Sequence, residues 1–208
     1  MTATAHGPTA PPSDGAGGRP HVLVAALGDT EHGDEGFAAH VLRSLPRDVL
    51  PAGVEVAYYG TATDRLLADL ERGWDGLVVL DALPERGCPG SLRVVDLDNR
   101  RTVTLSHDLD APRGEAPAGT TLVDAARRLV PRTVLVGCEV VTADERVGLT
   151  GDVEACVRPA ARFVLSVLGR ITGTHVPEPD WLREADEAPG DDGDRDLLLT
   201  RGPLGRLR

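Results

Sequence analysis

Residues Gly28–Phe37, with the sequence GDTEHGDEGF, join an apolar segment of strand length to an amphipathic helix. The preceding segment, His21–Leu27, has no polar interruption along its apolar run, which is typical of a strand covered on both faces in a parallel sheet. After the turn, apolar residues recur with helical spacing at Phe37, Val41, Leu42 and Leu45. The segment therefore predicts a buried strand and a helix that packs on the same sheet.

The turn itself is acidic: it contains no Lys or Arg, and it carries Asp29, Glu31, His32, Asp34 and Glu35. A glycine-rich turn between a strand and a helix often binds phosphate, but these carboxylates would repel one. Carboxylates and an imidazole suit a divalent cation better. A structural role is equally open, in which Asp34 and Glu35 only complement the dipole of the helix that follows.

The rest of the chain alternates between strand and helix patterns. We expect further strands at 54–59, 76–80, 91–97 and 133–136, and helices at 64–70, 120–130 and 153–171. The strand at 91–97 alternates in polarity, so one of its faces should be exposed, and Leu122, Ala126 and Leu129 should face inward. This order predicts the α/β class, a three-layer α/β/α sandwich with a mostly parallel twisted sheet of about five strands.

Composition divides the chain into three parts. Residues 1–20 are rich in Thr, Ala, Pro and Gly and are expected to be a disordered N-terminal arm. Residues 21–173 are expected to form one α/β domain. Residues 174–208 are expected to be an acidic, disordered C-terminal tail, in which residues 177–196 carry nine acids and two arginines, a balance of −7 against a net charge of −11 for the chain.

Candidate functional residues gather where strands end, because ligand sites in such sheets lie at the carboxyl ends of the strands. Asp81 ends an apolar strand, so its carboxylate is either paired or binds something. His107, in the segment LSHDL, follows the fourth expected strand at the start of a long loop. If that loop folds over the strand ends, Glu35, Asp81 and His107 could hold a divalent metal and leave positions open for substrate or water.

Several functional classes are disfavoured by the sequence. The acidic net charge makes nucleic acid and anionic membrane surfaces poor partners. The chain has no secretory signal pattern and no apolar stretch of membrane-spanning length, so a cytoplasmic location is expected. Its three cysteines are widely spaced and form no disulfide framework, and there is no G-x-S-x-G or H-E-x-x-H motif.

The order of motifs between about His21 and Gly169 resembles the hydrogenase maturation endopeptidases. The matching motifs are LVAALG before GDEGF, GTA after the second strand, VVLDA ending the third, S-H-x-L in the next loop, VLVG-x-E, and GLT before the final helix. The resemblance implies an α/β/α fold. It also implies an endopeptidase that removes the C-terminal extension of a nickel–iron hydrogenase large subunit after nickel insertion.

The same resemblance assigns the site and the partner. It implies that Glu35, Asp81 and His107 are the catalytic, nickel-recognising residues. The nickel would be supplied by the substrate, the immature nickel–iron hydrogenase large subunit, so no permanently bound cofactor is expected. The protein would act as a monomer in the cytoplasm.

Two loops depart from the family pattern. The segment Gly28–Thr30 reads Gly-Asp-Thr where Gly-Asn-Pro or Gly-Asn-x is usual, and Tyr58–Thr63 replaces Asp-Gly-Gly-Thr-x-Gly. Two alternatives therefore stay open. One is a maturation factor that recognises the nickel site or binds metal without cleaving. The other is a small-molecule hydrolase or phosphate-binding enzyme on a similar sheet.

Overall fold

The computed structural model describes residues 18–97, 101–105, 121–140 and 147–180. Residues 1–178 form one compact unit and residues 179–208 a second, of which only Pro179 and Asp180 are described. The first unit contains the whole sheet and all of its helices in the described part of the chain.

The described sheet has six strands in the order β2-β1-β3-β6-β4-β5. They are β1 (Val22–Leu27), β2 (Val54–Gly60), β3 (Gly76–Pro84), β4 (Leu92–Asp96), β5 (Arg101–Leu105) and β6 (Thr133–Val140). Strands β2, β1, β3 and β6 are parallel, whereas β4 runs antiparallel to both β6 and β5. The sheet is therefore mostly parallel, as the sequence predicts, with one strand more than expected.

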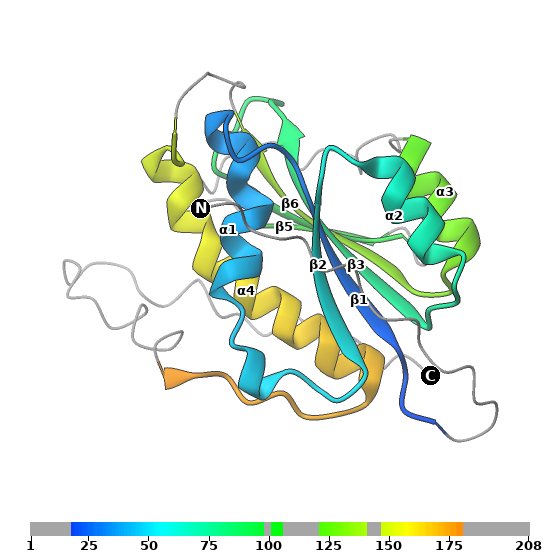
Figure 1. The fold of residues 1–208 in the computed structure, drawn as a ribbon. Coiled ribbons are helices and arrows are strands. Elements are labelled where there is room, and N and C mark those ends of the chain that lie inside the picture. The colour runs from blue at the N-terminus through cyan, green and yellow to red at the C-terminus, as the bar shows by residue number, and fades with distance from the viewer. Residues whose placement is uncertain (1–17, 98–100, 106–120, 141–146, 181–208) are drawn as a thin grey trace. The chain divides into compact units, whose positions relative to one another are not determined.

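Helices cover both faces of the sheet, which makes the fold a three-layer α/β/α sandwich (Figure 1). Helices α1 (Phe37–Ser44) and α4 (Gly151–Thr172) lie together on one face, and α2 (Thr63–Leu70) and α3 (Thr121–Leu129) lie on the other. Short 3₁₀ turns, η1 (Gly33–Gly36) and η2 (Arg47–Val49), precede and follow α1. The predicted α/β/α class is confirmed.

The central strands are buried on both faces because each face is covered by helices. All six residues of β1 are buried, as its uninterrupted apolar sequence predicts. On the α2/α3 face, alternate residues such as Val79 and Leu83 join a core cluster with Leu66, Leu70 and Ala126. On the α1/α4 face, Gly76 lies so close to Ile171 that an added Cβ would be 2.8 Å from its side chain.

Two local expectations were wrong. The strand β4 has no exposed face, because residues Leu92–Val95 are all buried. The polar residue among them, Arg93, points into the protein and forms an ion pair with Glu139. In α3, Ala126 packs inward but Leu129 is 40% exposed, because the helix ends at that residue and Val130 takes the buried position.

The additional strand, β5, changes how the chain reaches the expected position of His107. We expected His107 to follow the fourth strand directly. Because β4 is antiparallel to β6, its end lies at the amino edge of the parallel strands, where the Leu97 amide donates to the Thr133 carbonyl. Strand β5 then brings the chain back, and Leu105 pairs with Leu92 at the level of Cys138. The chain therefore returns to the carboxyl edge of the sheet two residues before position 107.

Candidate active site

Asp81 lies inside β3 rather than at its end, because this strand continues to Pro84 alongside β6. Strand residues alternate between faces, so Asp81 shares the α2/α3 face with Val79 and Leu83. Its carboxyl group is largely buried. Burial raises its pKa from 3.8 to about 6, opposed by a hydrogen bond from the Ala82 amide and reinforced by the negative charge of Glu35.

Glu35 therefore lies close enough to Asp81 for their charges to repel each other. It belongs to the 3₁₀ turn Gly33–Gly36, where its amide donates to the His32 carbonyl over 3.1 Å. The side chain is partly exposed. The structure thus brings two of the three predicted site residues together, at the carboxyl edge of the parallel strands.

Gly28 allows the acidic turn to fold back onto the end of β1. It has a φ of 99°, and a Cβ at this position would be 2.2 Å from the Glu35 carbonyl oxygen. Its own carbonyl accepts a 2.7 Å hydrogen bond from the Tyr58 hydroxyl, and its amide donates to Gly60. Tyr58, one of the departures from the family pattern, therefore borders the turn directly and is 37% exposed.

Asp29 is held within the turn. Its Oδ1 accepts the Glu31 amide over 2.9 Å, and His32 Nδ1 lies 2.9 Å from its Oδ2. The Glu31 amide, aided by His32, holds the pKa of Asp29 below its usual range. These contacts occupy Asp29 and His32 with each other, whereas the charge of Glu35 acts on Asp81.

The sequence position of Asp34 suggested that it complements the dipole of α1, the helix that follows it. The structure instead places its carboxylate in contact with Thr150. It is only 3% exposed, and its two carboxylate oxygens accept hydrogen bonds from Thr150, one from the amide and one from the hydroxyl. Thr150 immediately precedes α4, so Asp34 connects the acidic turn to the last helix. This contact joins the GDEGF and GLT segments, a link that local sequence patterns do not reveal.

Glu139, the glutamate of the VLVG-x-E motif, has a structural role. It is fully buried and accepts hydrogen bonds from the amides of Arg86 and Cys88 and, over 3.0 Å, from Nη2 of Arg93. Burial alone would raise the pKa of Glu139, but these donors outweigh it and hold the pKa below its usual range. The Glu139 carboxylate thus holds the β3–β4 connection against β6.

The third predicted site residue, His107, lies outside the described residues, as does the rest of 106–120. In the described part of the chain, no group of three His, Cys, Asp or Glu side chains is arranged to hold a metal ion. The role of Glu35, Asp81 and His107 as a set therefore stays a prediction.

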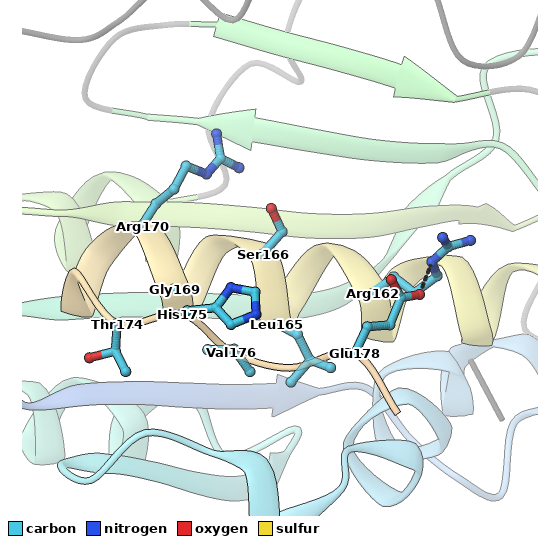
Figure 2. A pocket seen from close by; sticks show the side chains of 9 residues that line it. All are labelled: Arg162, Leu165, Ser166, Gly169, Arg170, Thr174, His175, Val176 and Glu178. Atoms are coloured by element: carbon cyan, nitrogen blue, oxygen red, sulfur yellow. Dashed lines mark ion pairs between the residues drawn. The ribbon is translucent and has the colours of Figure 1, made fainter. Parts of the chain in front are cut away.

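A cavity of about 340 Å³ lies along the second half of α4 (Figure 2). It is lined by Arg162, Leu165, Ser166, Gly169, Arg170, Thr174, His175, Val176 and Glu178. Ser166 points away from the His175 ring, and Glu178 is paired with Arg162, so these residues form no catalytic triad (Figure 2). Helix α4 starts beside Asp34 and ends beside Gly76, so this cavity lies toward the opposite edge of the sheet from Glu35 and Asp81.

The fold is an α/β sandwich, and Glu35 and Asp81 place its candidate chemistry at the carboxyl edge of the sheet. The sequence matches the family model described as hydrogenase maturation protease over residues 39–167, more than half of the chain. This range contains Asp81 and position 107 and begins after Glu35.

Individual relatives agree with the family match. The hydrogenase 2 maturation protease of Escherichia coli is 29% identical over 153 residues, 71% of this chain and 90% of that protein. A hydrogenase 2 maturation peptidase structure from a Thaumarchaeota archaeon is 30% identical with a TM-score of 0.52, covering 72% of this chain and 98% of the other. A structure of the hydrogenase maturating endopeptidase of Escherichia coli is 25% identical with a TM-score of 0.55, covering 72% and 93%.

The chain belongs to the hydrogenase maturation protease family and is a peptide hydrolase. The family resemblance inferred from the order of its motifs is thereby confirmed.

Proposed function

We propose that this protein removes the C-terminal extension of a nickel–iron hydrogenase large subunit after nickel has been inserted. In this proposal, nickel already bound to the substrate meets Glu35, Asp81 and His107. Docking of the metal would report that insertion is complete and would place the scissile bond. The family match supports the general activity, and the properties of the two carboxylates support the role of the metal.

The observation that carries the proposal is the position of Asp81, a largely buried carboxyl group in β3 next to the acidic turn that contains Glu35. Burial and the charge of Glu35 raise the pKa of Asp81 to about 6, which is a cost that a purely structural carboxylate would avoid by pairing with a cation. A divalent cation between Glu35 and Asp81 would offset both the burial of the Asp81 carboxylate and its repulsion by Glu35. Two carboxylates and one imidazole are few ligands, which suits a metal that arrives with ligands of its own from the substrate.

The path of the chain supports including His107. Leu105 ends β5 at the same edge of the sheet as Asp81, three strand spacings away, or ~14 Å. Two further residues span at most ~7 Å. The rest of the distance between Leu105 and Asp81 is of the order that the Asp and His side chains and two metal–ligand bonds of ~2 Å can cover together.

The chemistry would follow from the metal and the geometry of the edge. Nickel bound to a substrate carbonyl or water would act as a Lewis acid, which removes the need for a serine or cysteine nucleophile. Cys138 and Cys156 are buried, so a substrate peptide bond cannot reach their thiols, and contact with Cys156 together with burial also raises the pKa of Cys138.

The test is cleavage of purified precursor subunit, prepared with and without nickel, followed on a gel. Wild type should cleave only the nickel-loaded precursor. The variants His107→Ala and Asp81→Asn should keep the fold and lose processing. His175→Ala, an exposed histidine beside α4, is the matched control and should cleave at the wild-type rate.

Three results would contradict parts of this proposal. Cleavage of nickel-free precursor by wild type would exclude recognition of the metal. Wild-type activity in His107→Ala would remove that residue from the site. Tight binding of nickel-loaded precursor by wild type without cleavage would favour the alternative, a maturation factor that recognises the nickel site and does not cut. The exposed Tyr58, which changes the border of the acidic turn, is the feature that keeps this alternative open.

A further inference from the structure

The hydrogen bonds between Asp34 and Thr150 join two segments that are 116 residues apart. The Thr150 amide donates to Oδ1 of Asp34 over 2.6 Å, and the Thr150 hydroxyl donates to Oδ2 over 2.9 Å. Both donors are neutral, and Asp34 is 3% exposed. A buried carboxylate requires hydrogen-bond donors, and in the described residues Thr150 supplies one to each oxygen of Asp34.

Thr150 holds the N-cap position of α4 but does not cap this helix with its own side chain. A threonine at this position usually accepts a hydrogen bond from an amide in the first helical turn. Here its hydroxyl is directed to Asp34 instead, and the Asp34 carboxylate lies at the positive end of a 22-residue helix. The start of α4 is therefore used to hold Asp34 in place.

Asp34 is the residue immediately before Glu35, and the turn that contains both has little freedom. On one side, the Glu35 carbonyl rests on Gly28, where no Cβ could fit. On the other side, Thr150 holds Asp34. The backbone of Glu35 is thereby fixed between the end of β1 and the start of α4.

We propose that Asp34 is a positioning residue, which acts through its hydrogen bonds to Thr150 to hold the turn Gly33–Gly36, and with it Glu35, in place beside Asp81. This inference rests on the proposed function, because it assigns Glu35 to contact with nickel on the substrate. Asp34 itself has both carboxylate oxygens occupied and is buried, so it does not contact the substrate.

Two variants break the contact to different degrees. Asp34→Ala removes both hydrogen bonds, and Thr150→Val removes only the hydroxyl bond at nearly constant volume. Thr150→Ser restores the hydroxyl and is the conservative rescue. The matched control is Thr172→Val, at the far end of α4, which removes a hydroxyl bond to the Leu168 carbonyl in the same helix.

The first measurement is hydrogen exchange of the Glu35 amide, which needs no substrate. Thr150→Val should speed exchange in the turn Gly33–Gly36 and leave β3 unchanged, whereas Thr172→Val should leave the turn unchanged. The second is the ratio of affinities for nickel-loaded and nickel-free precursor, measured below the melting temperature of every variant. Groups that orient a metal ligand typically change such affinities by ~10- to 100-fold when removed.

We expect Asp34→Ala and Thr150→Val to lose most of the preference for nickel-loaded precursor, and Thr150→Ser and Thr172→Val to keep it. A general loss of stability would weaken binding of both precursor forms alike and leave the ratio unchanged. Unchanged exchange in the turn, or an unchanged ratio in Thr150→Val, would overturn the inference while leaving the proposed function intact. A wild-type ratio of one would overturn the proposed function, and this inference with it.

Discussion

At the scale of single residues, the distinctive feature of this protein is Asp81, a largely buried carboxyl group that has no cationic partner among the described residues. Asp81 combines a partly buried position in β3 with the nearby charge of Glu35, and both raise its pKa. A structural aspartate of the kind seen at position 34 is satisfied by hydrogen bonds from Thr150. The Ala82 amide donates a hydrogen bond to Asp81 that lowers its pKa, but this bond does not offset the effect of burial.

Neutralising this charge should stabilise the isolated protein. The change in pKa from 3.8 to about 6 corresponds to at most ~3 kcal/mol, and partial exposure to solvent leaves ~1–2 kcal/mol. Asp81→Asn should therefore raise the melting temperature at pH 7.5 by about 2–8 °C. Calorimetry of wild type and variant across pH is the measurement.

The pH dependence of this effect has a definite sign. Below pH 4 the carboxyl is protonated in the folded and unfolded states, so the difference between variant and wild type should nearly vanish. Between pH 4 and about 6 the folded protein retains a proton that the unfolded chain releases, and wild type loses stability as pH rises. A variant that is less stable than wild type at pH 7.5 would show that Asp81 has a stabilising partner.

At the scale of elements, the antiparallel pair β4 and β5 completes one edge of the sheet, and its attachment depends on a buried ion pair. Arg93 on β4 is 4% exposed and pairs with Glu139 on β6, which is fully buried. Glu139 also accepts the amides of Arg86 and Cys88, so the same carboxylate holds the connection between β3 and β4. The edge that leads toward position 107 is therefore coupled to the parallel core by this ion pair as well as by the pairing of β4 with β6.

Replacing one member of the Arg93–Glu139 pair should lower the free energy of unfolding much more than replacing both. Glu139→Leu leaves a buried guanidinium without its partner and should cost about 3–5 kcal/mol. The double variant Arg93→Met/Glu139→Leu should recover part of that loss, because no uncompensated charge remains. Urea denaturation of the two single variants and the double variant would measure the coupling, and strictly additive effects would contradict it.

At the scale of the whole molecule, the described fold is one α/β/α unit, with residues 179–208 forming a second unit. None of the helices in the described part of the chain has the length and apolar content needed to span a bilayer. Both the family match, over residues 39–167, and the sheet lie within the first unit. The terminal segments are thus additions to the part that the relatives share.

Deletion of Ala188–Arg208 should leave the melting temperature nearly unchanged, because this segment is rich in Asp and Gly and has no apolar periodicity. The same holds for deletion of Met1–Gly18. Thermal melts of the two truncations beside the full chain are the measurement. A fall of several degrees on removal of the C-terminal segment would indicate that Leu197–Leu199 packs on the core.

The sequence by itself determined the layers and the chemistry of the acidic turn. Uninterrupted apolar segments such as β1 predict strands buried on both faces, and the turn Gly28–Phe37 concentrates acids where parallel sheets carry their sites. The order of the motifs indicated the family, and Glu35 and Asp81 do come together. These features could be predicted because hydrophobic periodicity is visible within a short segment, and the order of strands and helices is given by their order along the chain.

The tertiary structure decided what depends on contacts between distant residues. Strand β5 has the alternating sequence RTVTL after the polar sequence DNR, a hairpin signal too short to be recognised in the sequence. The bonds from Thr150 to Asp34 and the Arg93–Glu139 pair join residues 116 and 46 positions apart. Such pairings leave no periodic pattern in the chain, because hydrogen-bond partners are chosen only when packing brings their elements together.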